Sequence, residues 1–363
     1  MTGVSPAERR RISLTAIGEF LLVILFVVSL PVLFIWTLWL FWAVLATALV
    51  LGLLVRGVAL LLMGSELRGH TLATLILTFC LLTISVAFPI YYLIYKVEAD
   101  PPLLPNVVLT NGEKTVVFQG MIHVGMESFY KSVVYDLEEA LSDGYRLYYE
   151  GVQPSPGEGD AWFAEQLAGG GDLAENYKVL ADACGVKFQI DYFGLMERDA
   201  QQHPERHVAA DVTSLEMKQE YDRLMATDPA FAEQVRDREA PASTYTSDPV
   251  AALLDWHASA TDEQKKLIGI LCRGAFAIAL GDQSEHEPRP LDKVILAFRN
   301  RKLAQRIIAD DSQRIYITYG AAHLPGVLAA LQAADPDWQI TTVKWMRGMA
   351  TPEHLEGALP SMP

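Results

Sequence analysis

Residues 20–55 read FLLVILFVVSLPVLFIWTLWLFWAVLATALVLGLLV, and none of these side chains is charged. A transmembrane helix needs roughly 20 apolar residues, so the stretch is long enough to cross a bilayer twice. Trp36, Trp39 and Trp42 lie around Thr37 in its middle, and tryptophan is enriched at membrane–water interfaces. The sequence therefore predicts two membrane spans joined by a tight turn at Thr37.

A third apolar run covers residues 72–95 and ends in tyrosines just before Lys96. Basic residues precede the first span and border the connection to the third: Arg9, Arg10, Arg11, Arg56 and Arg68. Because basic flanks mark the cytoplasmic side, three spans would place everything after residue 97 outside the cytoplasm. An even number of spans would leave it inside. We interpret residues 1–97 as a multi-pass anchor in a bacterial-type plasma membrane, since a cleaved signal peptide would be shorter and single.

The rest of the chain is acidic. Of 44 acidic and 29 basic residues, three acids and six basic residues lie in residues 1–97, which leaves 41 acids, 23 basic residues and a formal charge of −18 for the remaining 266 residues. This charge argues against nucleic acid and anionic headgroups as partners of that part. Membrane lipid is expected as a partner of the anchor, and the oligomeric state is left open.

We expect the acidic part to be an α/β domain built from two related β-α-β units. The pattern strand, Gly-x-x-His, helix, strand occurs twice: residues 115–121, 126–141 and 146–152, then residues 314–319, 324–333 and 338–345. Right-handed crossovers would make the strands parallel, so the fold class is a helical transmembrane bundle followed by a mixed or parallel sheet. The expected boundaries are a proline-rich linker at 98–112, the domain at 113–350 and a tail at 351–363.

The two units are separated by a segment of mainly helical pattern. Residues 173–184 predict a helix, residues 187–192 a strand, and residues 213–290 a helical insertion. An amphipathic helix over residues 294–308 leads into the second Gly-x-x-His strand. Cys184 and Cys272 are far apart without metal-type spacing, and the sequence leaves open whether they pair.

Each Gly-x-x-His motif follows a buried strand. Gly120-Met121-Ile122-His123 closes the first strand and Gly320-Ala321-Ala322-His323 closes the second. Glycine lets the chain leave a strand sharply, and ligands of α/β folds bind at the carboxyl ends of strands. Glu150 ends the strand that follows the first motif. We therefore expect His123, Glu150 and His323 to converge on one site, although a single such histidine is as often a turn residue.

Two imidazoles and a carboxylate suit two kinds of chemistry. They can hold a divalent metal that keeps open positions for water and substrate, with Mn, Co or Zn as candidates. Without a metal they can act as a general base and acid, since histidine titrates near neutrality. The residues alone do not choose between these alternatives.

These motifs resemble those of the TraB/PrgY and TIKI family. The resemblance rests on Gly120 to His123, on Glu150 within Tyr149-Glu150-Gly151, and on Tyr319 to Gly326, with Phe298-Arg299-Asn300-Arg301 similar to the Arg-Asn helix start of that family. It spans about residues 116–326 and leaves out the anchor. In the family and its erythromycin-esterase and ChaN-like relatives, paired Gly-x-x-His motifs and a glutamate form the active site, and TIKI proteins are metal-dependent proteases at the cell surface.

The resemblance implies catalytic roles for His123, Glu150, His323 and Arg299, with the first three as metal ligands. Arg299 can hold a carboxylate or stabilise an oxyanion, or it is a helix-surface arginine paired with an acid. Asp211 is at most a support for these residues, and a solvated or capping aspartate is the simpler interpretation. The sequence His203-Pro204-Glu205-Arg206-His207 lacks the glutamate of a zinc-protease helix and reads as a surface loop.

We expect a membrane-anchored, metal-dependent hydrolase that acts on a peptide or protein. The alternative is a regulatory membrane protein that binds a peptide, a pheromone or a metal-containing ligand in the same pocket without turnover.

Overall fold

The computed structural model describes residues 6–34, 38–63, 71–167, 172–239, 256–281 and 289–350. Three N-terminal helices are long and apolar enough to cross a membrane: α1 (Pro6–Phe34), α2 (Leu38–Met63) and α3 (Thr71–Glu98). These are the three predicted spans, and their length and composition are consistent with a membrane protein. The turn expected at Thr37 and the tail at 351–363 lie outside the described residues.

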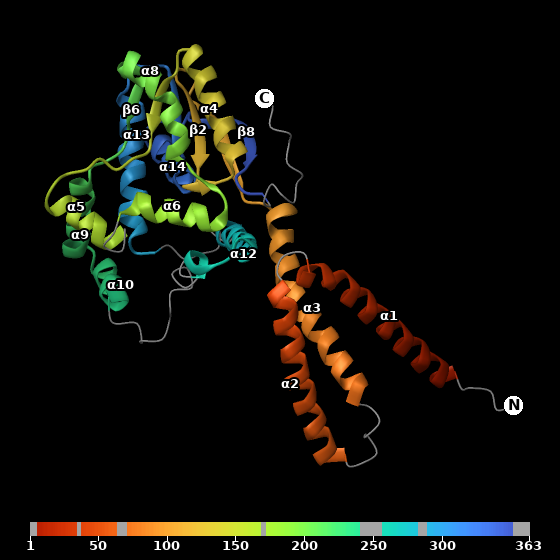
Figure 1. The fold of residues 1–363 in the computed structure, drawn as a ribbon. Helices are drawn as coiled ribbons and strands as arrows, with labels where there is room; N and C mark the ends of the chain where they lie inside the picture. Colours follow the sequence, from red (N-terminus) through yellow and green to blue (C-terminus); the bar gives the residue numbers. More distant parts are fainter. Residues whose placement is uncertain are drawn as a thin grey trace.

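Figure 1 shows α2 running away from the α/β domain and α3 returning to it. Val32 of α1, Leu40 of α2 and Ile90 of α3 pack into one apolar cluster with Leu267 of α12 (Asp262–Gly281). The Tyr91 hydroxyl also donates to the Val28 carbonyl oxygen at 2.7 Å. The end of α1, the start of α2 and the end of α3 therefore meet on the side of the domain.

The domain is built on a mixed six-stranded sheet with the order β6-β4-β7-β2-β1-β8. The strands are β1 (Leu103–Thr110), β2 (Thr115–Met121), β4 (Arg146–Tyr149), β6 (His207–Ala209), β7 (Arg314–Gly320) and β8 (Gln339–Arg347). β2 and β4 pair in parallel with β7, and β6 pairs in parallel with β4. β1 is antiparallel to both β2 and β8, so every strand except β1 points the same way.

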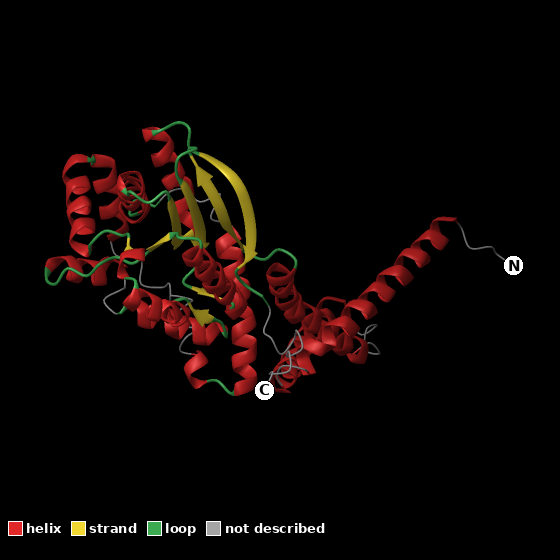
Figure 2. Cartoon of the chain, turned by 90° about the horizontal axis from the view of Figure 1, so that it is seen from above, coloured by secondary structure: helices red, strands yellow, loops and turns green. Residues whose placement is uncertain are grey.

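Helices cover both faces of this sheet, as Figure 2 shows. On one face α4 (Glu127–Ser142) buries Phe129, Val133 and Leu137 against β-strand residues such as Leu147. On the other face α13 (Arg299–Ala309) and α14 (Leu324–Ala334) bury a second apolar set against the sheet: Leu303, Ile307, Val327 and Leu331 with Val116, Phe118, Ile315 and Ile317. The result is a three-layer α/β/α domain whose strands β2, β4 and β7 end at a common edge.

The prediction of a linker at residues 98–112 is wrong in its central part, because residues 103–110 form β1. Asn106 to Thr110 pair with β2 and Leu103 to Thr110 pair with β8. Pro105 lies in this strand opposite Trp345 of β8 but outside its ladder with β2. A proline has no N–H to donate, which made the segment read as irregular.

The two strands of each expected β-α-β unit, β2 with β4 and β7 with β8, run parallel as predicted. In neither unit are the two strands neighbours in the sheet. β7 lies between β2 and β4, and both β2 and β1 lie between β7 and β8. The origin of the two units by duplication stays a prediction.

A smaller helical layer borders the carboxyl ends of the strands. It contains α5 (Glu158–Leu167), α6 (Leu173–Cys184), α9 (Ser214–Thr227), α10 (Pro229–Glu239) and α12. The short helices α7 (Ile190–Phe193) and α8 (Glu197–Gln202) instead lead along the α4 side of the sheet to the start of β6. The short strands β3 (Val124–Gly125) and β5 (Lys187–Phe188) pair antiparallel beside it. Cys184 of α6 and Cys272 of α12 form a disulfide that the sequence did not predict.

Two further expectations differ from the structure. The strand expected at 187–192 is only β5, because Ile190 begins α7. The helix expected at 294–308 starts as a π-helical segment, η5 (Lys293–Phe298), and continues as α13. The helical insertion at 213–290 is helical in α9, α10 and α12, whereas residues 240–255 and 282–288 lie outside the described part.

Candidate functional site

The predicted site residues come from the carboxyl ends of neighbouring strands. His123 follows β2 by two residues, Glu150 directly follows β4, and His323 ends the short helix η6 (Ala321–His323) after β7. Because β7 lies between β2 and β4, these three junctions are adjacent at one edge of the sheet. This placement brings the predicted residues to one site.

Gly320 leaves room for the Glu150 carboxylate at this edge. Its backbone N–H donates to Glu150 Oε2 at 2.5 Å, and a Cβ at this position would lie 3.3 Å from the same oxygen and 3.5 Å from His323 Cδ2. Its φ is −47°, so no left-handed conformation is involved. The glycine of the second motif therefore allows the Glu150 carboxylate to approach the backbone.

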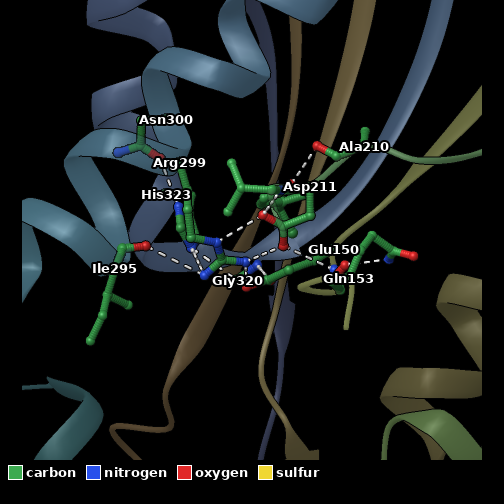
Figure 3. Close-up of polar contacts among 12 residues, drawn as sticks. Glu150, Gln153, Ala210, Asp211, Ile295, Arg299, Asn300, Gly320 and His323 are labelled. Atoms are coloured by element: carbon green, nitrogen blue, oxygen red, sulfur yellow. Dashed lines mark hydrogen bonds and ion pairs between the residues drawn. The ribbon is translucent and has the colours of Figure 1, made fainter. Parts of the chain in front are cut away.

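Arg299 links the acidic residues of the site, as Figure 3 shows. Its Nε and Nη2 donate to the two carboxylate oxygens of Asp211, at 2.9 and 2.5 Å. Nη2 also donates to Glu150 Oε1 at 2.7 Å. Nη1 contacts the Ile295 carbonyl oxygen at 3.4 Å and His323 Nε2 at 3.3 Å. A guanidinium has five N–H groups, so this arrangement engages all of them.

This geometry corrects two interpretations made from the sequence. Asp211 is neither solvated nor a helix cap, because its side chain is 0% exposed and pairs with Arg299. Arg299 is not on the helix surface either, since 7% of its side chain is exposed. With every N–H engaged, Arg299 positions Glu150 rather than offering a free donor to an oxyanion.

Asn300 fixes the orientation of His323. The Asn300 Oδ1 atom lies 2.6 Å from His323 Nδ1, and His323 is 3% exposed. An amide oxygen only accepts, so Nδ1 carries the hydrogen and Nε2 faces Arg299 and Glu150. Nε2 lies 3.5 Å from Glu150 Oε1. Asn300 was not predicted as a site residue, although it stands beside Arg299 in the motif that resembles the family.

His123 has its own set of contacts, on the wall that two cavities share. Its ring stacks on Tyr177 of α6 with 4.3 Å between centroids, and its Nδ1 lies 3.0 Å from Gln189 Nε2. The Gln189 N–H also donates to the His123 carbonyl oxygen at 3.0 Å. Tyr177 and Gln189 were missed because neither belongs to a strand-end motif.

The surroundings move the pKa values of these groups in different directions. Burial lowers the pKa of His123, Glu150 opposes this effect, and Arg299 and His323 lower it further. For Glu150, burial raises the pKa, but the neighbouring His323 and the Arg299 charge outweigh it and hold the pKa well below its usual range. At neutral pH, His123 is therefore neutral and Glu150 is ionised.

The arrangement does not fit the expected three-ligand metal shell. Among the described ranges, no three His, Cys, Asp or Glu side chains converge as a metal would require. The Arg299 guanidinium lies against the Glu150 oxygen and the His323 nitrogen that were expected as ligands. A cation there would have to displace a paired guanidinium, so the metal roles of His123, Glu150 and His323 stay predictions.

Two cavities meet at the site. One of about 1100 Å³ extends to Tyr92 and Lys96 of α3, and one of about 1230 Å³ extends between α5 and α6 toward Met217 of α9. Both are lined by the same six residues: His123, Glu150, Tyr177, Gln189, Ile295 and Arg299. The site thus has space for ligand on two sides.

Of the two histidines expected in a surface loop, His203 and His207, the second has a structural role. The His203 side chain is 45% exposed, but the His207 side chain is 7% exposed on β6. His207 Nε2 lies 2.7 Å from Asp199 Oδ2, and His207 Nδ1 lies 2.5 Å from the Tyr149 hydroxyl. The loop interpretation is therefore wrong for His207, which ties α8 to β4 beside Glu150.

Comparison of the chain with protein-family models, with curated proteins and with solved structures finds no match.

Proposed function

We propose that the chain is a membrane-anchored hydrolase that cleaves a peptide or protein outside the cytoplasm. The observation that carries the proposal is the meeting of a neutral His123 and an ionised Glu150 on the wall shared by two cavities. A neutral imidazole beside a fixed negative charge is the pairing that general-base catalysis uses.

In the proposed reaction, His123 takes a proton from water as its oxygen attacks the substrate carbonyl carbon. The Glu150 carboxylate stabilises the imidazolium electrostatically. The carbon–nitrogen bond then breaks and the same proton passes to the leaving amine, so that one water yields one carboxyl and one amino terminus. Arg299, Asp211 and Asn300 hold Glu150 and His323 in place.

The motif likeness to the TraB/PrgY and TIKI family supports the peptidase assignment, and with it the idea of two related β-α-β units. The need for a divalent metal is tested separately, because Glu150 and His323 face Arg299. If metal binds, it would supply Lewis-acid polarisation of the scissile carbonyl.

Two features support a position outside the cytoplasm. The domain follows three apolar helices. In the sequence, Arg9, Arg10 and Arg11 precede the first apolar run, and Arg56 and Arg68 lie before the third, which are cytoplasmic flanks by the positive-inside rule. The Cys184–Cys272 disulfide belongs in an oxidising compartment, since disulfides are rare in the cytosol.

A binding role without turnover is favoured by one observation, which is that Arg299 has no N–H left for an oxyanion. A pocket with satisfied charges can hold a ligand without stabilising a transition state. In that case His123 substitutions would weaken ligand capture while no product forms.

The test uses the full chain in nanodiscs with a pool of unstructured peptides in ¹⁸O-water. The proposal expects new carboxyl termini that carry ¹⁸O, with at least 100-fold less product from His123→Gln. Chelation followed by Mn²⁺, Co²⁺ or Zn²⁺ then shows whether metal is required. Capture of peptides without any ¹⁸O-labelled product would contradict hydrolysis and support the binding alternative.

A further inference from the structure

The cavity on the side of α3, called the membrane-side arm, is lined near its mouth by Tyr92 and Lys96 of α3, Phe276 and Ile278 of α12, and Trp345 of β8. It reaches from this mouth to Glu150 and His323. One end of the candidate active site thus opens onto a membrane-spanning helix. The other cavity, called the far arm, shares six lining residues with the membrane-side arm and is otherwise lined by residues that include those of α5, α6 and α9.

The mouth of the membrane-side arm lies at the depth of the lipid headgroups. A hydrocarbon core of about 30 Å takes up roughly 20 residues at 1.5 Å each, so a span that begins at Leu72 leaves the core near Tyr92. Tyr91, Tyr92 and Tyr95 mark the same level, because tyrosine is enriched at the interface. Lys96 lies about one helical turn higher, which is within the headgroup layer.

Helix α12 forms the wall of the arm that faces the bilayer. Leu267 of α12 packs into the cluster with Ala87 and Ile90 of α3. Farther along the helix, a Cβ on Gly274 would lie 2.5 Å from Leu93 Cβ. Only a glycine allows so close an approach, so α12 lies directly against the part of α3 that leaves the membrane. The mouth between them has exposed apolar side chains, with Ile278 37% and Trp345 60% exposed.

The two arms favour a chain over a lipid molecule as ligand. A lipid that enters from the bilayer would occupy the membrane-side arm and end at the reacting groups. The far arm, a cavity of about 1230 Å³, is lined by the same reacting groups and extends from them to α5, α6 and α9. Residues on both sides of a cleaved bond would fill both arms, as an extended peptide does.

We propose that the substrate is a membrane-tethered peptide segment, cleaved close to the bilayer surface. The part next to the tether lies in the membrane-side arm, the bond to be cleaved lies at His123 and Glu150, and the part beyond lies in the far arm. This inference rests on the proposed hydrolase function and adds the substrate class to it.

The test compares three forms of one fluorogenic peptide pool with randomised eight-residue cores. The pool is free, or joined directly to a single transmembrane helix, or joined to the same helix through a 40-residue Gly/Ser spacer. The full chain and the tethered pools share the same liposomes, so both tethered forms have equal surface density. We expect the directly tethered pool to be cleaved at least tenfold faster than the spacer form. Equal rates, or a faster spacer form, would overturn the inference and leave the hydrolase function standing.

A variant of the mouth makes the test independent of tether design. Ile278→Trp narrows the membrane-side arm and should lower the rate ratio of directly tethered to spacer pool at least fivefold. Ile340→Trp on β8 is the control, because Ile340 is similarly exposed at 42% and lines neither arm. An unchanged ratio in Ile278→Trp would contradict the inference.

If no pool is cleaved, the hydrolase function itself is contradicted. A binding experiment then tests the inference. A photo-crosslinking amino acid replaces Ile278, and the directly tethered pool is added in liposomes. The inference expects crosslinks to the peptide that the spacer form gives at least fivefold less. Crosslinks to lipid alone, unchanged by the peptide, would show that the arm holds lipid and would overturn the inference.

Discussion

Arg299 and Asp211 form a two-point ion pair inside the domain, with Nε and Nη2 of the arginine on the two oxygens of an aspartate that is 0% exposed. The same guanidinium holds Glu150 at 2.7 Å. Burial lowers the pKa of Arg299, but Asp211 and Glu150 outweigh this effect and raise it, so the cation is permanent. The site is therefore organised around a fixed positive charge between two carboxylates.

Removal of Arg299 should destabilise the protein and alter the site together. Arg299→Gln leaves Asp211 buried without its charge partner, which costs roughly 3–5 kcal/mol of unfolding free energy. Arg301→Gln is the matched control on the same helix, since its side chain is 52% exposed and its partner Glu220 keeps a second ion pair with Arg223, and it should cost at most about 1 kcal/mol. Chemical unfolding of both variants in nanodiscs measures the difference. Equal losses of unfolding free energy in the two variants would show that the buried Arg299–Asp211 pair does not stabilise the fold more than the Arg301 pair does.

Loss of the Asn300 contact should reduce activity more than stability. Gly326 lies in α14, and a Cβ on it would sit 2.1 Å from Asn300 Nδ2. Gly326→Ala therefore displaces Asn300 from His323 and should lower kcat at least tenfold with little change in KM. Gly194→Ala has nothing within 4 Å of the new methyl group and serves as the control. A Gly326→Ala enzyme with the wild-type kcat would contradict a role for the Asn300–His323 contact.

The pH profile should report the burial of His123. Its lowered pKa keeps the ring neutral at pH 7, so kcat/KM falls only when the pH drops through a value below the ordinary 6.5. The same shift contributes stability that is complete above pH 6.5 and is lost as the pH falls toward the folded-state pKa. Tyr177→Ala uncovers the ring and should move the acidic limb of kcat/KM to higher pH.

Tyr177→Phe keeps the ring that stacks on His123 and should leave the acidic limb in place. If the acidic limb of kcat/KM in Tyr177→Ala lies at the same pH as in the wild type, the stack with Tyr177 does not set the His123 pKa. A limb above pH 6.5 in the wild type would contradict His123 as the neutral base.

The Cys184–Cys272 disulfide should stabilise the helical layer beside the site. The bridge closes a loop with a sequence separation of 88, and native disulfides typically add about 2–4 kcal/mol. A Cys184→Ser/Cys272→Ser double variant should lose that amount, and dithiothreitol should destabilise the wild type but not the variant. Cys80→Ser in α3 is the control. Free thiols at both positions in protein taken from native membranes would argue against a location outside the cytoplasm.

The strands that carry the site could be predicted well because their apolar and β-branched runs are unambiguous. β2, β4 and β7 begin where the sequence indicated, and the histidines and Glu150 follow their ends. β1 could not be predicted because Pro105 suppresses a strand pattern, although it lies outside the β1–β2 ladder. A strand tolerates a proline where no neighbouring strand needs its N–H, and the sequence alone does not show which strands will be neighbours.

The supports of the site were harder to predict than its centre. Asp211 and Arg299 are 88 residues apart, and neither position reads as buried in its own segment. Tyr177 reaches His123 from α6, which has an ordinary amphipathic pattern. Such contacts depend on how the layers pack, so sequence patterns over a single element do not contain them.

The most direct measurement of the central claim is peptide cleavage by the full chain in nanodiscs, scored by mass spectrometry for three proteins. Wild type and His203→Gln, whose exposed histidine lies outside both cavities, should cleave the pool at equal rates. His123→Gln should cleave it at least 100-fold more slowly while keeping the wild-type unfolding midpoint. Cleavage by His123→Gln at the wild-type rate would contradict the account.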